Sequence, residues 1–285
     1  MTLSITAIIP TLNEELNLEE CLRSIQWCEK ILVVDSGSTD GTRRIAEKHG
    51  ASIVEHPFEN HTAQWSWALA SLPITTEWVL GLDADQRVSD ALIGSIRNAF
   101  RQGDPACDGF YLCRRQIFRG QWIRHGGYYP KYLLKLFRRS RVILDPEDIA
   151  EHHFHVRGSS RKLAGDLIED NRNEMDLSAW CEKHVQYAKR VALEETRRRA
   201  GKRQWAIRAN PWGSPDQRSV GAKQLWDHLP LYTRCYLYFL YRYFLQLGFL
   251  DGPEGRRFHL LQGFWYRLLI DAYIDAGWKN GERPG

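Results

Sequence analysis

Short apolar runs alternate with stretches of helical spacing over the first hundred residues. The runs are rich in Ile, Val and Leu, which is typical of buried strands. The predicted strands cover residues 4–9, 30–34, 51–55 and 76–82. The predicted helices cover residues 16–25, 42–49, 64–72 and 91–100. Strands that alternate with helices in this way predict an α/β fold whose neighbouring strands run parallel through right-handed crossovers.

The pattern changes after residue 100. Residues 108–113 predict a further strand. Residues 114–124 alternate basic with apolar or aromatic side chains, which suits a strand with one cationic face, and that face either binds an anion or is simply solvated. From residue 177 onward helical spacing dominates. The predicted helices of this region cover residues 177–199, 232–250 and 258–278, with a break at 210–215 and a turn at 251–255.

Polar loops leave three of the predicted strands. Residues 10–15 follow the first strand, residues 35–42 the second, and Asp83 and Asp85 the fourth. Ligands of such sheets collect at the carboxyl ends of the strands. Residues two apart in an extended chain point the same way, so the two aspartates could share one hard cation. The alternative is a turn that leads into a helix near Ser89.

The first two loops also have alternative interpretations. Asn13 or Thr11 could cap the helix that follows the first strand, which needs no ligand. Asp35, at the end of the second strand, could accept hydrogen bonds from a ribose or a base. The loop after it contains neither Gly-x-Gly-x-x-Gly nor Gly-Lys-[Ser/Thr], which argues against a dinucleotide-binding fold of that type and against a P-loop.

Composition sets limits on the class of protein. Of the 285 residues, 43% are hydrophobic and 26% charged, which is typical of a globular chain. The formal net charge of +4 does not by itself indicate nucleic-acid binding, and we expect none. The basic residues cluster in 114–124, 131–141 and 183–208. The six cysteines form no Cys-x-x-Cys pair, and the first residues lack the basic region of a signal peptide, so we expect a cytoplasmic protein with reduced thiols.

Three motifs follow one another along the chain. They read Ile8-Ile9-Pro10-Thr11-Leu12-Asn13-Glu14, Val33-Val34-Asp35-Ser36-Gly37-Ser38-Thr39-Asp40-Gly41-Thr42 and Leu82-Asp83-Ala84-Asp85. In this order and spacing they resemble family 2 of the nucleotide-sugar glycosyltransferases. The resemblance implies a GT-A fold, which is an α/β, Rossmann-like, mostly parallel sheet flanked by helices. It places the nucleotide-sugar-binding and catalytic domain in residues 1–170 and a helical C-terminal extension in residues 171–285.

The resemblance also implies a set of site residues. The nucleotide-sugar pocket would be lined by Pro10, Thr11, Asn13, Glu14, Asp35, Ser36, Asp40, Gln64, Asp83 and Ala84. Asp83 and Asp85 would hold Mg²⁺ or Mn²⁺ against the diphosphate of the donor, which we expect to be a UDP-hexose.

Within that family the chain is similar to the bacterial glucosyltransferases of lipopolysaccharide core assembly. The supporting segments are Asp83 to Ser89, Lys135 to Arg139 and Gly248 to Gly255. The implied activity is metal-dependent, inverting transfer of a hexose to a saccharide, with a lipid-linked acceptor. Two positions depart from those relatives: Gln86 replaces an acid, and Glu151-His152 replaces a His-Glu pair. The alternatives are a protein side chain or soluble glycan as acceptor, or a non-catalytic nucleotide-sugar-binding protein.

Inverting transfer needs one general base for the acceptor hydroxyl. Glu151 and Asp148 are both candidates, and alignment of the motifs does not decide between them. Three histidines follow within four positions, His152, His153 and His155. A zinc site would need further Cys or His at matching spacing, and none is nearby. We therefore expect one of them, His152, to complete the cation site of the two aspartates.

The C-terminal helices carry many of the aromatic rings. Arg234 and Arg242 interrupt the apolar run of residues 232–250, so it does not predict a spanning helix. A helix of this kind either lies in the bilayer interface or packs on the catalytic domain or on a second subunit of a homo-oligomer. The resemblance favours peripheral contact with the inner face of the cytoplasmic membrane.

Overall fold

The computed structural model describes residues 2–148, 152–203 and 205–277. The chain forms two compact units. Unit 1 consists of Met1–Ile117, Pro130–Leu144 and His153–Asn173. Unit 2 consists of Phe118–Tyr129, Asp145–His152 and Glu174–Gly285. The functional division of the chain at residue 170 stays a prediction.

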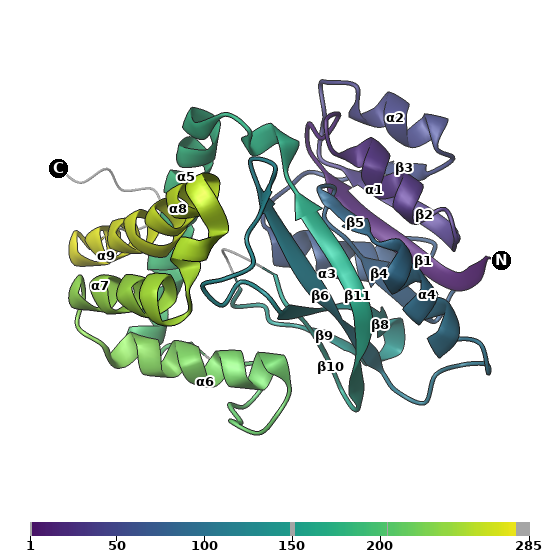
Figure 1. Ribbon diagram of the computed structural model, residues 1–285. Coiled ribbons are helices and arrows are strands. Elements are labelled where there is room, and N and C mark those ends of the chain that lie inside the picture. Colours follow the sequence, from purple (N-terminus) through teal and green to yellow (C-terminus); the bar gives the residue numbers. More distant parts are fainter. Residues whose placement is uncertain (1, 149–151, 204, 278–285) are drawn as a thin grey trace. The chain divides into compact units, whose positions relative to one another are not determined.

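Unit 1 is built on one mixed sheet (Figure 1). Its strands, in the order in which they lie side by side, are β3 (Ser52–Glu55), β2 (Cys28–Asp35), β1 (Leu3–Thr11), β4 (Trp78–Gly81), β8 (Lys131–Arg138), β6 (Gly109–Phe118), β11 (Ser160–Asp170) and β5 (Gln86–Val88). The first four pair in parallel, β8 is antiparallel to both of its neighbours, β6 and β11 are parallel, and β5 is antiparallel to β11. β9 (Val142–Leu144) and β10 (Phe154–Val156) form a separate antiparallel pair.

The parallel half of the sheet brings the three predicted loops to one edge. Thr11 at the end of β1 pairs with Asp35 at the end of β2, and Ile8 pairs with Gly81 at the end of β4. Parallel strands end on the same side of a sheet, so the loops after β1, β2 and β4 leave together at their carboxyl ends. This arrangement confirms the predicted α/β architecture around a central β1.

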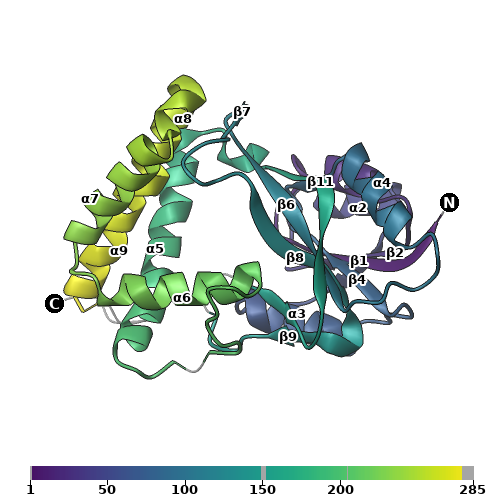
Figure 2. The ribbon, with the colours of Figure 1, turned by 60° about the horizontal axis from the view of Figure 1, so that its bottom comes forward.

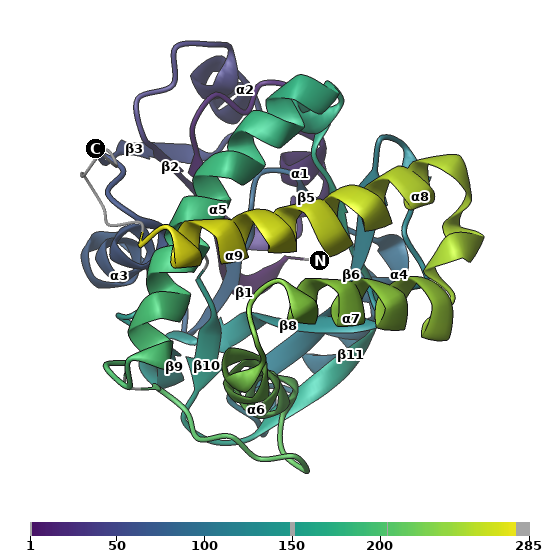
Figure 3. The ribbon, with the colours of Figure 1, turned by 90° about the vertical axis from the view of Figure 1, so that its left-hand side faces the viewer.

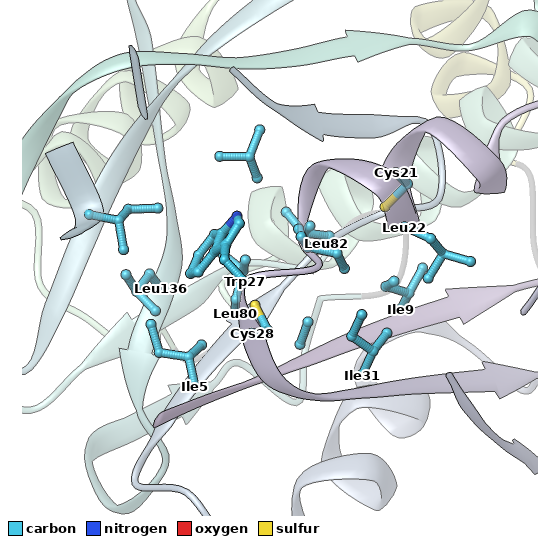
Figure 4. Packing of buried hydrophobic residues seen from close by; sticks show 14 of the residues in the cluster. Ile5, Ile9, Cys21, Leu22, Trp27, Cys28, Ile31, Leu80, Leu82 and Leu136 are labelled. Atoms are coloured by element: carbon cyan, nitrogen blue, oxygen red, sulfur yellow. The ribbon is translucent and has the colours of Figure 1, made fainter. Parts of the chain in front are cut away.

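Helices cover both faces of this sheet. They are α1 (Leu18–Ser24), α2 (Thr42–Lys48), α3 (His61–Ser71) and α4 (Asp90–Ala99). Residues of α1, α2 and α4 join one apolar core, which includes Ile5, Leu80 and Leu136 (Figure 4). The opposite core contains α3 and Phe154. Figure 2 shows α3 and β9 on the other side of the sheet from α2 and α4.

The structure corrects several sequence-based expectations in unit 1. Residues 114–124 are not one strand, because β6 ends at Phe118 and Arg119 and Gly120 both take positive φ angles. The short strand β7 (Gln121–Trp122) lies in unit 2. Five further strands of unit 1, β5, β8, β9, β10 and β11, were not predicted. Charged residues in β5, β8 and β11 interrupt the apolar pattern that predicts a strand. The strands with which these three pair lie far away in the sequence, so no local pattern indicates the pairing.

Unit 2 is mainly helical (Figure 3). Its helices are α5 (Leu177–Arg199), α6 (Pro215–His228), α7 (Thr233–Leu240), α8 (Gly252–Leu260) and α9 (Tyr266–Asp275). π-helical turns follow α7 and α8, at η3 (Tyr241–Leu245) and η5 (Leu261–Trp265). The described part of the chain also contains short 3₁₀ helices at η1 (Arg139–Arg141), η2 (Arg172–Glu174) and η4 (Gly248–Asp251).

The structure corrects three expectations for unit 2. Residues 232–250 are not one helix, because α7 and η3 end at Leu245 and Leu247 has a φ of 60°. Helix α6 was not predicted, although Ser214 and Gln217 form a capping box at its start. Residues 251–255 are not a turn, because α8 begins at Gly252 with Pro253 in its first turn. Across the described residues no helix is both long and apolar enough to cross a membrane.

Charged residues occupy much of the interior of unit 2. Arg234 is fully buried, and its guanidinium donates to Asp271 on α9 and to Glu195 on α5, 2.7 Å away. Arg198 pairs with Asp227 on α6 at 2.8 Å. The apolar clusters of this unit are small. One of them joins α5 to α9 and includes Ala188, Tyr266 and Ile270. Ion pairs therefore join four of the five helices.

Candidate functional site

Asp35 organises the loop after β2. Its side chain is fully buried, and its Oδ1 accepts from Thr11 Oγ1 at 3.2 Å and from Ser38 Oγ. Its Oδ2 accepts from the backbone N–H groups of Gly37 and Ser38, 3.3 and 3.0 Å away. Gly37 has a φ of 94°, a conformation that glycine adopts without strain. The carboxylate thus joins the ends of β1 and β2 and holds the first turn of the loop in shape.

Asn13 connects the loop after β1 to the loop after β2. Its N–H donates to Ser38 Oγ at 2.9 Å, and its Oδ1 accepts from the N–H of Thr39 at 2.9 Å. Its φ of 55° lies in the left-handed region, which asparagine tolerates better than most residues. The capping alternative for Asn13 and Thr11 was wrong, because α1 begins at Leu18 and Asn17 occupies its N-cap position.

Glu14 is held by groups from distant parts of unit 1. Its N–H donates to Thr42 Oγ1 at 2.7 Å, and its Oε2 accepts from Asn17 at 2.7 Å and from Asn173 at 3.2 Å. Asn173 also donates to the carbonyl of Asn13 at 3.1 Å. Sequence reasoning missed Asn173, because nothing in a position 160 residues away signals that contact.

The other predicted pocket residues lie around the same edge. Asp40 accepts from the N–H groups of Thr42 and Glu15, at 2.9 and 3.1 Å. Partial burial acts to raise the pKa of Asp40, but the hydrogen bonds from Thr42 and Glu15 outweigh it and hold that pKa below its ordinary value. Gln64 is buried on α3 and donates to Ser36 Oγ at 3.2 Å. Pro10 is partly buried in β1, and Ala84 belongs to the apolar core.

Asp83 and Asp85 follow β4 in a tight turn that ends in β5. The N–H of Gln86 donates to the carbonyl of Asp83 at 3.0 Å, and the side-chain oxygen of Gln86 accepts from the N–H of Asp83 at 3.1 Å. The amide nitrogen of Gln86 donates to Glu169 at 2.8 Å. A carboxylate at this position could not donate to Glu169. The departure from the relatives' acid at position 86 thus has a structural reason.

Lys135, on β8, is a site residue that the sequence analysis did not assign. Its ammonium donates to Asp83 Oδ2 at 2.8 Å. The lysine side chain is 6% exposed, whereas that of Asp83 is 40% exposed. The available signal was a lone lysine inside the apolar run Leu133 to Phe137.

The carboxylates of this turn act on the buried thiol of Cys21 in α1. Burial raises the pKa of the Cys21 thiol, and the charges of Asp85 and Asp83 raise it further. The thiol is therefore protonated and donates to the carbonyl of Asp83 at 3.8 Å. Two carboxylates from one turn supply oxygen ligands, which fit Mg²⁺ or Mn²⁺. Within the described ranges, no group of three or more His, Cys, Asp or Glu side chains is arranged to hold a metal ion.

The structure describes one of the two predicted catalytic residues, Asp148. Asp148 belongs to unit 2, where its buried carboxylate pairs with Arg203. Burial acts to lower the pKa of Arg203, but Glu194 and Asp148 outweigh it and raise that pKa. Glu151 lies outside the described residues. His152 belongs to unit 2, and its role as a metal ligand stays a prediction.

The arginines of β6, from the basic segment of residues 114–124, form ion pairs within the protein. Arg114 pairs with Glu169 of β11 at 3.2 Å, and Arg115 pairs with Asp166 of the same strand. The side chains of both arginines are partly buried. The two alternatives of the sequence analysis, an anion-binding face and a simply solvated face, thus both omitted the cross-strand carboxylates that these arginines contact.

Comparison with known proteins settles the family. The family described as glycosyl transferase family 2 matches residues 6–168, which is more than half of the chain and includes all three loops. The chain belongs to glycosyl transferase family 2. The family assignment agrees with the motifs at Asn13, Asp35 and Asp83, and with the sheet edge at which they meet.

Relatives within the family match part of the chain. The lipopolysaccharide core biosynthesis glycosyltransferase LpsC of Rhizobium meliloti is 30% identical over 149 residues, 49% of this chain and 52% of its own length. An uncharacterized glycosyltransferase of Rickettsia conorii is 39% identical over 101 residues, 35% of each chain. The chain thus spans about half, or less, of the length of these relatives.

A solved structure supports the fold over nearly the whole chain. The mannosyltransferase PcManGT from Pyrobaculum calidifontis, in complex with GDP-Man and Mn²⁺, superposes with a TM-score of 0.53 and covers 96% of this chain and 87% of its own. The two sequences are 17% identical. The similarity confirms the predicted GT-A architecture, including a helical C-terminal region.

Proposed function

We propose that this protein is an inverting glycosyltransferase that moves a hexose from a nucleotide diphosphate sugar, a UDP-hexose, to a saccharide acceptor. The observation that carries the proposal is the meeting of three loops at the carboxyl ends of β1, β2 and β4, with Asp83 and Asp85 in the third. Fixed polar groups at such an edge can bind a nucleotide without moving, which favours catalysis by positioning.

The three loops bind different parts of the donor. Asn13, Glu14 and Asp35 are tied to one another through Ser38, Thr39 and Thr42, so they present a rigid edge to the nucleoside. Asp83 and Asp85 would hold Mg²⁺ or Mn²⁺. When bound, the cation neutralises the negative charge that builds up on the leaving diphosphate.

The transfer step needs a base from this chain. The acceptor oxygen forms a bond to the anomeric carbon and loses its proton to the base, while the bond to the diphosphate breaks and its electron pair leaves with the diphosphate. Glu151 and Asp148 are the proposed bases. The ion pair with Arg203 stabilises the charged form of Asp148.

The acceptor that we propose is a lipid-linked saccharide of the lipopolysaccharide core or another surface polysaccharide. LpsC, by its name, acts in lipopolysaccharide core biosynthesis. The alternatives keep the same donor chemistry and change the acceptor to a protein side chain or a soluble glycan.

An exposed apolar face on unit 2 supports the proposal that the protein acts at a membrane surface. On α7, η3 and η4 the exposed side chains are almost all apolar or tyrosine. They are Tyr236, Leu237, Leu240, Tyr241, Phe244, Leu245, Leu247, Phe249 and Leu250, which are 45–76% exposed. The buried residues of α7 are Arg234 and Cys235. A helix of a water-soluble protein has the opposite polarity, with its apolar side buried.

The charge of the chain favours an anionic lipid surface as the partner of this face. Residues 174–285 carry 18 Lys and Arg against 12 Asp and Glu, whereas residues 1–173 carry 21 against 23. Exposed Arg256 and Arg257 follow the face on α8. Apolar side chains flanked by arginine and tyrosine are typical of helices that lie in the bilayer interface. We propose peripheral contact with the cytoplasmic side of the membrane.

Ligand-dependent thermal stability tests the proposed donor and cation. The protein is heated with a panel of nucleotide sugars, UDP-glucose, UDP-galactose and GDP-mannose, each with and without Mn²⁺. We expect one donor to raise the melting temperature only with Mn²⁺, because a ligand that binds the folded state alone stabilises it. Release of nucleoside diphosphate from that donor then separates an enzyme from a non-catalytic binder. No shift with any donor contradicts the proposal.

A further inference from the structure

A buried lysine lies at the mouth of the donor site. Lys135 is 5% exposed, and its neighbours Leu134, Leu136 and Phe137 all belong to apolar cores. Placing an ammonium in such surroundings costs free energy unless it is paired. Among the described residues, its polar contact is one hydrogen bond to Asp83 Oδ2 at 2.8 Å, and the ring of Phe154 lies 5.9 Å away.

The backbone of β8 is irregular at this residue. Phe110 and Tyr111 are consecutive on β6, but their partners on β8 are Leu136 and Leu134, so Lys135 is an extra residue of a β-bulge. In a regular strand, residues two apart share a face. Here Leu134 joins one core and Leu136 the core on the opposite side of the sheet. The bulge thus turns Lys135 away from the regular alternation and allows its ammonium to reach Asp83.

One hydrogen bond uses a third of the donor capacity of the ammonium, which has three N–H groups. The partner carboxylate is 40% exposed, so the pair borders the open side of the turn. A buried cation with two remaining donors beside the Asp83 to Asp85 turn is suited to an anionic ligand.

We propose that Lys135 is a donor-binding residue whose ammonium binds a phosphate oxygen of the nucleotide diphosphate. The proposal rests on the proposed function, because it takes its ligand from the nucleotide sugar. Lys135 then has two roles: it positions Asp83 and adds a positive charge beside the diphosphate. That charge stabilises the leaving diphosphate more than the intact donor, because the leaving group carries the greater negative charge.

The test compares two lysine-to-methionine variants of the full chain. Lys135→Met keeps the length of the side chain and removes the ammonium. Lys162→Met is the matched control, because Lys162 is exposed, also belongs to unit 1 and lies over the ring of Tyr132 on the same strand β8. Calorimetry measures the binding of inorganic pyrophosphate with Mn²⁺, and of UDP and uridine with Mn²⁺.

We expect Lys135→Met to weaken the binding of pyrophosphate and of UDP by about tenfold or more, because a hydrogen bond between charged groups is lost. Uridine binding should change less than threefold, and Lys162→Met should bind all three ligands like the natural protein. Equal pyrophosphate affinity for Lys135→Met and the natural protein overturns the proposal. So does an equal loss for uridine and UDP, because that pattern indicates a disturbed turn and no phosphate contact.

Two further variants keep the proposal testable if Lys135→Met fails to fold. Lys135→Arg retains the positive charge, and it should retain more pyrophosphate affinity than Lys135→Gln, which is neutral. Equal affinities for these two variants contradict a charge-based contact. Pyrophosphate binding with Mn²⁺ requires no sugar transfer, so the outcome for Lys135 remains readable even if the protein transfers no hexose.

Discussion

The two units place their charged and apolar side chains in opposite ways. Unit 1 has an interior of Ile, Leu and Val, and its polar groups collect at one edge of the sheet. Unit 2 buries Arg203, Arg234 and their carboxylates, and its α7 exposes leucine, phenylalanine and tyrosine. The first arrangement is typical of a domain that binds a polar small molecule in water. The second stabilises the unit through ion pairs and leaves apolar surface for a partner.

Breaking the buried ion pairs tests the first half of this comparison. Arg234→Met leaves the carboxylates of Asp271 and Glu195 without their guanidinium in a buried setting. We expect a loss of about 3–5 kcal/mol in the free energy of unfolding, because each buried charge then lacks its partner. Urea denaturation measures the change. The control is Arg218→Met, on the exposed surface of α6, which should alter stability by less than about 0.5 kcal/mol. Similar stabilities of the two variants would show that the buried pair does not hold unit 2 together.

The acidic turn of unit 1 should control chemistry more than stability. Asp85→Asn removes one negative charge from the proposed cation site. We expect Mn²⁺-dependent release of nucleoside diphosphate from the donor to fall by at least about 100-fold, since the cation stabilises charge on the leaving group. Asp90→Asn, at the exposed start of α4, is the control and should retain activity. Full activity of Asp85→Asn would exclude this carboxylate from the mechanism.

The apolar face of unit 2 should control membrane association. The natural protein should sediment with liposomes that contain anionic lipid at low salt and be released at high salt, because salt screens the attraction of the arginines. Phe244→Ser combined with Leu245→Ser should lower the partition coefficient by about tenfold or more, since each large apolar side chain contributes about 1.5–3 kcal/mol when buried.

Leucine outside the face provides the matched control for that experiment. Leu225 is 68% exposed on α6, and Leu225→Ser should leave sedimentation unchanged. If the natural protein does not sediment but forms a dimer that the double variant loses, the face binds a second copy of the chain and the membrane proposal is wrong.

The smallest expected effect concerns the pH dependence of unit 2. Burial acts to raise the pKa of Asp251, but hydrogen bonds from His259, His125 and two backbone N–H groups outweigh it and lower that pKa. The contribution of Asp251 to stability is therefore complete above the ordinary aspartate pKa of about 3.9, and is lost as the pH falls through the lower folded value. At acidic pH, Asp251→Asn should reduce the slope of the free energy of unfolding against pH by at most about 1.4 kcal/mol per pH unit. Unfolding measured between pH 5 and pH 2 checks this, and identical slopes would contradict it.

The sequence predicted the parts of the fold that depend on neighbours along the chain. The apolar runs that became β1, β2 and β4 and the spacing of α1 to α4 are local patterns, and the motifs at Asn13, Asp35 and Asp83 lie where those patterns end. The parallel order of these strands follows from short crossovers. The family and the loop positions could therefore be predicted without coordinates.

Contacts between residues far apart in the sequence were decided by the tertiary structure alone. Three examples are hydrogen bonds between distant segments. Lys135, placed by the bulge of β8, donates to Asp83, and Asn173 donates to Glu14. Gln86 donates to Glu169. In unit 2 the local pattern predicts helices but does not predict which side of each helix faces solvent. Whether Arg234 of α7 or Leu245 of η3 is buried depends on which side of this helical segment packs against the rest of unit 2, because only packing selects the face that leaves water.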